Sequence, residues 1–203
     1  MYWTTTHPAR QQEKDTMTSN NTNRPQVWVG CLACYNDGRL VGEWIDAEDA
    51  EDITIDSLHD YLPATLRTQV ERDSAHDELW CFDTNNMPRS GEMQPMDAAM
   101  WGRAYVELSD DSLWPAYMRW CYDVMDASEP PEVARFMQAY QGEYGSFADF
   151  GWEQYCELKP TEGMTDEQER YFDYEQWLRD LEMDYHVLPT MRVGSVWVFD
   201  AVV

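Results

Sequence analysis

The chain has 203 residues, of which 43% are hydrophobic and 14% aromatic, and its formal charge at pH 7 is −25. An apolar and aromatic content this high excludes a disordered acidic chain and predicts a folded protein of one large domain or two to three small ones. The charge argues against nucleic acid and anionic membranes as partners, because both would repel the protein.

Residues 1–26 are polar and lack periodicity, so we interpret them as a flexible leader, with Met17 as an alternative start. Without them, 11 basic residues stand against 37 acidic ones, a net charge of −26, so the acidity belongs to the folded part. No secretory signal and no apolar run of about 18 residues is present. With five cysteines, an odd number, this predicts a soluble cytoplasmic protein with reduced thiols.

Residues 27–93 are expected to form a small α/β domain. VWVGCLACY and RLVGEWI predict two strands of a hairpin around the turn residues Asn36, Asp37 and Gly38. Residues 78–82 predict a third strand of the same sheet. Residues 49–67 predict a helix. Its expected core residues are Ile53, Ile55, Leu58, Tyr61, Leu62 and Leu66.

Cys31 and Cys34 form a CxxC motif inside the first predicted strand, where positions i and i+3 point to opposite faces. No second CxxC and no well-spaced His accompanies them to complete a zinc site. We therefore interpret both as buried thiols rather than as a redox or metal pair, and we expect no cofactor and no metal.

Residues 94–145 are expected to form a helical domain. Residues 96–108 and 112–125 predict two helices, and a third starts after Pro130 and Pro131. The third helix has apolar residues at i, i+3, i+4 and i+7. These are Val133, Phe136, Met137 and Tyr140.

Residues 146–203 are expected to form an α+β domain. Ser146 and Asp149 predict the start of one helix, whose core residues are Phe147, Phe150, Tyr155 and Leu158. Thr165 and Gln168 form a capping box that starts a second helix, which is expected to reach Asp184. Its core side carries Tyr171, Tyr174, Trp177, Leu178 and Leu181. YHVLP and SVWVF then predict a closing pair of strands. The whole chain is thus assigned to the α+β class.

Carboxylates are concentrated in residues 42–60, which hold eight of them and no Lys or Arg. An EF-hand is excluded there, because Ala50 and Glu51 occupy loop positions that need an oxygen ligand and a Gly. The sequence also lacks GxSxG, a Walker loop and GxGxxG, and its four His lie in no catalytic signature. A carboxylate-pair enzyme stays conceivable in so acidic a chain, but we expect a protein that is not an enzyme.

The predicted helix after Thr165 carries acids at spacings of 3, 4, 7 and 4 on one flank, which is about 27 Å long at 1.5 Å per residue. One strand of B-DNA carries about eight phosphates over that length. Like charges at helical spacing weaken a helix, so either a partner favours them or the flank is an ordinary solvated face. The five acids are Asp166, Glu169, Asp173, Asp180 and Asp184.

VWVGCLACYNDGRLVGEWIDAEDAEDI, residues 27–53, resembles the opening VGxLAxYNxGxLxGxWID of the ArdA antirestriction proteins. AYQGEYGSFADF at 139–150, FDYEQWLRDLEMDYHVL and GSVWVF resemble further blocks of that family. Between about Asn85 and Glu132 the sequence departs from the family pattern, and it has no clear copy of the Leu- and Glu-rich antirestriction motif.

The resemblance implies an elongated, bent protein of three small domains, 27–93, 94–145 and 146–203, that imitates double-stranded DNA as a homodimer. It implies a bacterial host cell, an origin in a mobile genetic element or phage, and a type I restriction-modification enzyme as partner. Its carboxylates would take the place of phosphates. The candidate surface comprises Asp46, Glu48, Asp49, Glu51, Asp52, Asp56, Asp60, Glu132, Glu143, Asp149, Glu153, Asp166, Glu169, Asp173, Asp180 and Asp184. An alternative is an acidic adaptor or inhibitor of another basic protein, such as a CRISPR effector, without true mimicry.

Overall fold

The structure is a computed structural model that describes residues 24–70 and 76–202. Its chain forms two compact units. The first contains the described residues up to Met118 together with Ala127–Pro130, and the second contains Arg119–Asp126 together with the residues from Pro131 onward. Each unit combines helices with one small antiparallel sheet, which confirms the α+β class. The division into three domains stays a prediction.

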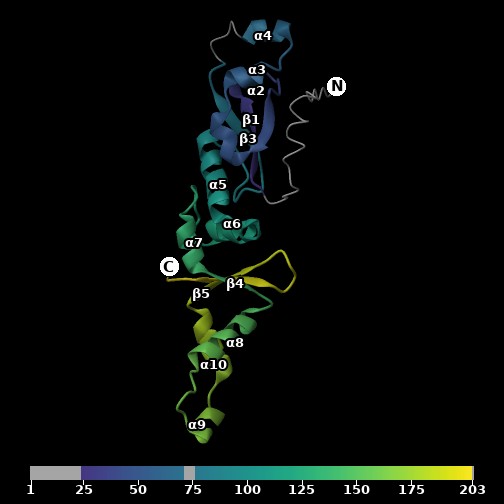
Figure 1. The fold of residues 1–203 in the computed structure, drawn as a ribbon. Coiled ribbons are helices and arrows are strands. Elements are labelled where there is room, and N and C mark those ends of the chain that lie inside the picture. The colour runs from purple at the N-terminus through teal and green to yellow at the C-terminus, as the bar shows by residue number, and fades with distance from the viewer. Residues whose placement is uncertain (1–23, 71–75, 203) are drawn as a thin grey trace. The chain divides into compact units, whose positions relative to one another are not determined.

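A three-stranded sheet of order β2-β1-β3 forms the centre of the first unit (Figure 1). Its strands are β1 (Gln26–Cys31), β2 (Gly42–Asp46) and β3 (Leu79–Asn85), as expected from the sequence. In the antiparallel register, Trp28 lies opposite Trp44 on β2 and Asp83 on β3. Val27, Val29, Ile45 and Cys81 point from the sheet into the core.

The predicted leader extends too far. Gln26 already pairs with Asp46 and Asn85 in the sheet, and the Pro25 carbonyl accepts a hydrogen bond of 2.9 Å from the Ala47 amide. Residues 1–23 of the predicted leader, which include Met17, lie outside the described residues.

The predicted helix over 49–67 is wrong as one element. The structure has instead a 3₁₀ helix η1 (Ala47–Asp52) and two short helices, α3 (Ile55–His59) and α4 (Ala64–Val70). Thr54 caps α3 through a capping box with Ser57, which starts a new helix there. Tyr61, predicted in the core, is 49% exposed because it lies in the turn after α3.

Strand β1 ends at Cys31, and the chain turns into a short helix, α2 (Leu32–Asn36), before a turn at Gly38 with φ +76°. The prediction that VWVGCLACY is a strand throughout is therefore wrong at its second half. Both thiols are buried, as predicted, but the helical turn places them on the same side of the chain. Burial, and then the Cys31 thiol, raise the pKa of the Cys34 thiol to about 11.

The middle of the chain is helical, as predicted. Helix α5 (Pro95–Leu108) is followed by η2 (Asp111–Leu113) and α6 (Trp114–Asp123). Trp114 is fully buried, stacks on Tyr117 at 5.5 Å, and donates a hydrogen bond of 2.8 Å from Nε1 to the Asn86 carbonyl. This aromatic cluster supplies the large apolar groups that a narrow core needs.

The second unit is built on a sheet of order β4-β6-β5. Helix α7 (Val133–Ala139) leads directly into β4 (Tyr140–Tyr144), and β5 (Tyr185–Pro189) and β6 (Val196–Asp200) complete the sheet. The predicted closing pair is confirmed, whereas β4 was missed. Tyr140 thus belongs to a strand, and Met137 is 50% exposed rather than in the core. Because β4 pairs with β6, residues 140–144 are part of this sheet.

Three helices complete the second unit: α8 (Phe147–Leu158), α9 (Asp166–Arg170) and α10 (Tyr174–Glu182). Helices α8 and α10 lie side by side, and α9 lies at the end of the unit far from the sheet (Figure 1). Both predicted caps are present, at Ser146 and at Thr165. The second predicted helix is nevertheless interrupted after Arg170, and Tyr171 is 83% exposed. Leu158, predicted inward, is 60% exposed.

Candidate functional site

The most acidic segment of the chain, η1, has a period of three residues. In AEDAEDI, residues 47–53, an apolar residue returns at Ala47, Ala50 and Ile53. A 3₁₀ helix has three residues per turn, so these side chains line up on one face. Ala47 and Ala50 are fully buried, whereas Asp49, Glu51 and Asp52 are exposed.

Helix α5 holds this segment by close backbone contact. Ala98 and Ala99 of α5 share a core cluster with Ala47 and Ala50 of η1. A Cβ added to Gly102 would lie 2.0 Å from the Glu48 nitrogen and 2.4 Å from the Glu48 Cα. The helix therefore approaches η1 at a distance that only Gly permits, and this contact fixes where the carboxylates stand.

The seven predicted site residues of the first unit lie on or beside η1 and α3. Asp49, Glu51, Asp52, Asp56 and Asp60 are exposed, whereas Asp46 and Glu48 are half-buried. The seven acids are close together in the sequence, so their proximity was expected. The structure adds which of them are exposed. Asp56 also lies in the first turn of α3, where a negative charge is favourable.

Four of these seven acids have internal basic partners. Arg24 pairs with Asp46 at 3.0 Å and with Glu48, Arg103 pairs with Glu51 at 2.8 Å, and Arg67 pairs with Asp60 at 2.5 Å. Asp49, Asp52 and Asp56 have no such partner within the described part of the chain. These three carboxylates are therefore the ones most available to a basic partner protein.

The stripe of five acids on one long helix is wrong, because the chain leaves the helix between α9 and α10. The side chain of Asp173 accepts a hydrogen bond of 2.9 Å from the Gln176 amide and caps α10. Asp166 and Glu169 belong to α9, and Asp173, Asp180 and Asp184 lie along α10 and the turns at its ends. All five are exposed, but only the last three still form one row.

The row on α10 is about 16 Å long at 1.5 Å per residue. Gln176 joins two of its three members, because its side-chain amide donates a hydrogen bond of 2.7 Å to Asp180 and its backbone amide donates one of 2.9 Å to Asp173. The row is thus held by α10 and the turns at its two ends.

A second row lies on α8. Asp149 and Glu153 were predicted, and Glu157 follows at the same spacing of four, which places all three on one face of the helix. All three are exposed. Sequence reasoning missed Glu157, although the i, i+4, i+8 pattern could have found it.

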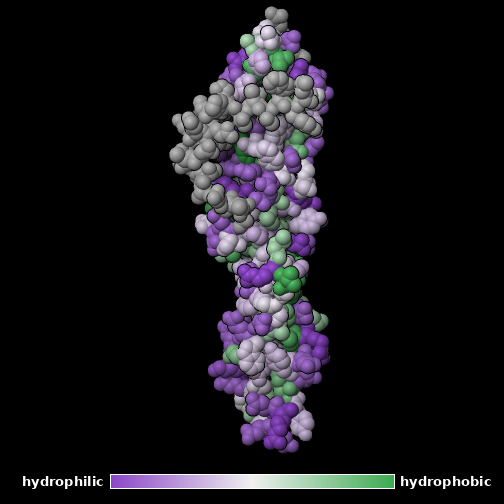
Figure 2. Space-filling model, turned by 90° about the vertical axis from the view of Figure 1, so that its right-hand side faces the viewer, coloured by the Kyte–Doolittle hydropathy of each residue, from purple (hydrophilic) through white to green (hydrophobic). Residues whose placement is uncertain are grey.

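The remaining two predicted acids lie near the start of the second unit. Glu132 is exposed at the N-cap position of α7. Glu143 is exposed on β4 and lies 3.7 Å from Arg192. Figure 2 shows hydrophilic residues gathered at the end of the second unit that carries α9, where Asp166, Glu167 and Glu169 are all exposed.

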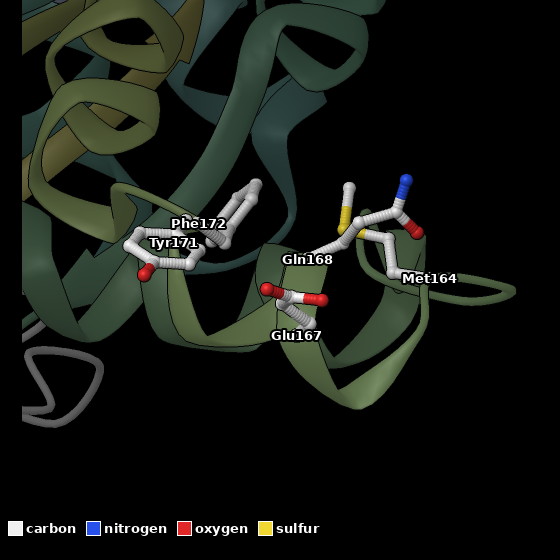
Figure 3. Close-up of a pocket in the computed structure, with 5 residues that line it drawn as sticks. All are labelled: Met164, Glu167, Gln168, Tyr171 and Phe172. Carbon is white, nitrogen blue, oxygen red and sulfur yellow. The ribbon is translucent and has the colours of Figure 1, made fainter.

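A hollow of about 470 Å³ lies beside α9 and is open to solvent. In Figure 3 the rings of Tyr171 and Phe172 stand on one side, Met164 and Gln168 on the other, and Glu167 between them. It brings together neither two carboxylates nor a carboxylate and a His, and the titratable side chains among its lining residues are those of Glu167 and Tyr171. Over residues 24–70 and 76–202, no three carboxylates converge closely enough to hold a metal ion.

Self-repulsion among these exposed acids predicts that the protein becomes more stable as salt rises from low to moderate concentration. The Debye length falls to about 10 Å at 0.1 M, which screens exposed like charges at larger separations. Thermal unfolding followed by circular dichroism at a series of NaCl concentrations measures the effect, and we expect the melting temperature to rise. A flat or falling curve would mean that the carboxylates are already neutralised by partners.

These features define an acidic α+β protein whose exposed carboxylates are grouped on η1 and α3 in one unit and on α8, α9 and α10 in the other. No helix within the described ranges has the length and apolar character to cross a bilayer. Residues 27–193 match the family model of the antirestriction protein ArdA, so the chain belongs to the ArdA family. A search of curated proteins finds no match to this chain. Membership in the family implies an antirestriction function and an interaction with restriction enzymes.

Proposed function

We propose that this protein is a DNA mimic that occupies the DNA-binding site of type I restriction-modification enzymes. The observation that carries the proposal is the set of exposed carboxylates that have no basic partner among the residues the structure describes, held on elements of fixed geometry. Asp49, Asp52 and Asp56 provide them in the first unit, and the rows on α8 and α10 provide them in the second.

The spacing of the rows supports the proposal. One strand of B-DNA carries a phosphate about every 3.4 Å along the axis, or about five over the 16 Å of the α10 row. Three carboxylates occupy that length, and α8 adds one about every 6 Å. The density of charge is lower than that of DNA but of the same order.

In this mechanism the exposed carboxylates bind the Lys and Arg side chains that otherwise hold phosphates. Long-range attraction by a surface of this charge steers the two proteins together and raises the association rate at low salt. DNA is then excluded because both ligands need the same groups. The fixed position of η1 on α5 limits the entropy lost on binding.

A homodimer in the bacterial cytoplasm is part of the proposal. It rests on the family resemblance, as does the division into three small domains. Acids that are already paired internally would contribute less to binding, because each would have to give up its internal Arg before it could bind a basic group of the enzyme. These acids are Asp46, Glu48, Glu51, Asp60 and Glu143.

A competition experiment tests the proposed function. A type I enzyme is bound to a labelled duplex carrying its target site, and the purified protein is added at increasing concentration. We expect full release of the duplex, with an apparent affinity that weakens in proportion as the DNA concentration is raised. The protein alone should neither bind nor hydrolyse the duplex.

Inhibition that persists at saturating DNA would contradict mimicry, and it would favour an acidic inhibitor that binds elsewhere on the enzyme. A fragment of calf-thymus histone or another unrelated basic protein serves as the specificity control. Equal affinity for that control would mean that the charge acts without regard to shape.

A further inference from the structure

Four side chains that bind metals well meet in the first unit, at the end of the sheet that carries α3. They come from three separate segments: Cys31 and Cys34 from the junction of β1 and α2, His59 from the end of α3, and His76 from the segment before β3. His59 follows Cys34 by 25 positions and His76 follows it by 42, so only the fold brings them together.

Their ligand atoms all lie within 4.8 Å of one another. His76 Nδ1 is 3.3 Å from Cys31 Sγ and 3.4 Å from Cys34 Sγ, and His59 Nε2 is 3.8 Å from Cys34 Sγ. A tetrahedral zinc ion, with bonds of about 2.3 Å to sulfur and 2.0–2.1 Å to nitrogen, separates its sulfur and nitrogen ligands by about 3.5 Å. The three sulfur–nitrogen distances of 3.3, 3.4 and 3.8 Å thus lie close to the separation that a shared zinc ion requires.

The surroundings of the cluster include a group, Arg39, that favours thiolates over neutral thiols. His59 is only 6% exposed. Its Nε2 faces the Cys34 thiol at 3.8 Å, a distance that is long for a hydrogen bond. The neighbouring Arg39 Nε is buried without a hydrogen-bond partner in the described part of the chain. A metal-bound thiolate is a strong acceptor for such an N–H group, whereas a neutral thiol is a weak one.

We propose that Cys31, Cys34, His59 and His76 form a structural zinc site. Two thiolates and two neutral imidazoles balance the charge of Zn²⁺, and mixed sulfur and nitrogen ligands in a tetrahedron favour zinc over calcium or magnesium. All four positions are taken by protein groups, so no position is open for water or substrate and the site is not catalytic. This assignment reverses the sequence-based expectation of a chain without metal.

The site would tie α3 to the sheet. Helix α3 has five residues and is joined to η1, whose acids repel one another, so local interactions alone hold it weakly. A zinc ion links the end of α3 to β1, α2 and the segment before β3, and its binding free energy becomes folding free energy of this unit. The inference is independent of the proposed function, since it concerns how the acidic segment is held.

The test uses the full chain, purified under reducing conditions without a histidine tag, because such a tag binds zinc itself. Elemental analysis should find one zinc per chain after dialysis. Replacing zinc by Co²⁺ should give the intense visible absorption of tetrahedral cobalt with thiolate charge-transfer bands. A strong chelator should lower the melting temperature, and added Zn²⁺ should restore it.

The matched variants are C34S/H76N, which removes one thiol and one imidazole of the cluster, and C156S/H186N, which removes the same groups at two exposed positions in the second unit. We expect the first variant to lose zinc and the second to keep it. If C34S/H76N does not fold, the zinc content of the single variant H76N is measured instead. This variant is expected to fold, because His76 is only half-buried.

A wild-type protein that contains no zinc and shows no cobalt bands on titration would overturn the proposal, as would a disulfide between Cys31 and Cys34 in the reduced preparation. Zinc retained by a folded C34S/H76N variant would overturn it too. In the first case the two thiols would be packing groups of the core, and in the last the zinc would be bound elsewhere.

Discussion

Exchanging Asp49, Asp52 and Asp56 for Asn is expected to weaken binding to a type I enzyme by roughly tenfold to 150-fold. The three carboxylates are exposed and have no basic partner within residues 24–70 and 76–202, so the exchange removes charge without releasing an internal Arg. At about 0.5–1 kcal/mol for each ion pair near the rim of an interface, three pairs contribute about 1.5–3 kcal/mol. Competition with labelled duplex at fixed low salt measures the loss.

The control is a variant with the same change in charge at exposed acids of the same unit outside the proposed surface, D77N/E92Q/E107Q. It should bind nearly as well as the wild type. In the D49N/D52N/D56N variant, association should slow at low salt and the dependence of affinity on salt should become shallower, because steering and ion pairing both scale with charge. Equal losses in the two variants would mean that total charge matters and that the arrangement on η1 and α3 does not.

Local signals in the sequence were enough for most elements that short-range chemistry decides. Alternation along VWV and GEWI placed β1 and β2, and the capping residues Ser146 and Thr165 placed the starts of α8 and α9. Strand β4 was missed because it follows α7 without a break, so the apolar pattern of the helix ran on into Tyr140. Its partner β6 lies far along the chain, which no local pattern reveals.

The acidic segments show two further reasons why prediction failed. The sequence of η1 was fitted to a period of 3.6 residues although Ala47, Ala50 and Ile53 repeat every three. The break before α10 followed from capping chemistry. Asp173 and Gln176 have the same spacing as Thr165 and Gln168, so the sequence did carry a second start signal that the apolar pattern obscured.

The Cys and His cluster lay beyond reach for a different reason. A zinc site is recognised in sequence when its ligands are close together, and here His59 and His76 stand far along the chain from the CxxC pair. Reading residues 27–35 as one strand then placed the two thiols on opposite faces, whereas the helical turn of α2 brings them together. Only the folded chain shows that two thiols and two imidazoles share one site.

The contact between α5 and η1 leads to the second strong prediction, for G102A. A Gly-to-Ala change inside a helix normally stabilises a protein by about 0.5–1 kcal/mol, because Ala loses less backbone entropy on folding. At Gly102 the added methyl group would stand 2.0 Å from the Glu48 nitrogen and 2.6 Å from the Ala47 carbonyl carbon. Both are backbone atoms of η1, which cannot rotate away, so η1 must shift. We expect a loss of about 1–3 kcal/mol in the free energy of unfolding of the first unit.

Urea unfolding followed by tryptophan fluorescence measures this loss, and the same variant should bind the enzyme more weakly, because Asp49 and Asp52 move with η1. The comparison is G145A, where the new methyl group would meet the Asp149 carboxylate, the far end of a side chain that can turn aside. G145A should leave stability nearly unchanged. A G102A protein as stable as the wild type would show that η1 moves at little cost. The acids of the first unit would then adapt to the partner rather than stand in fixed positions before it binds.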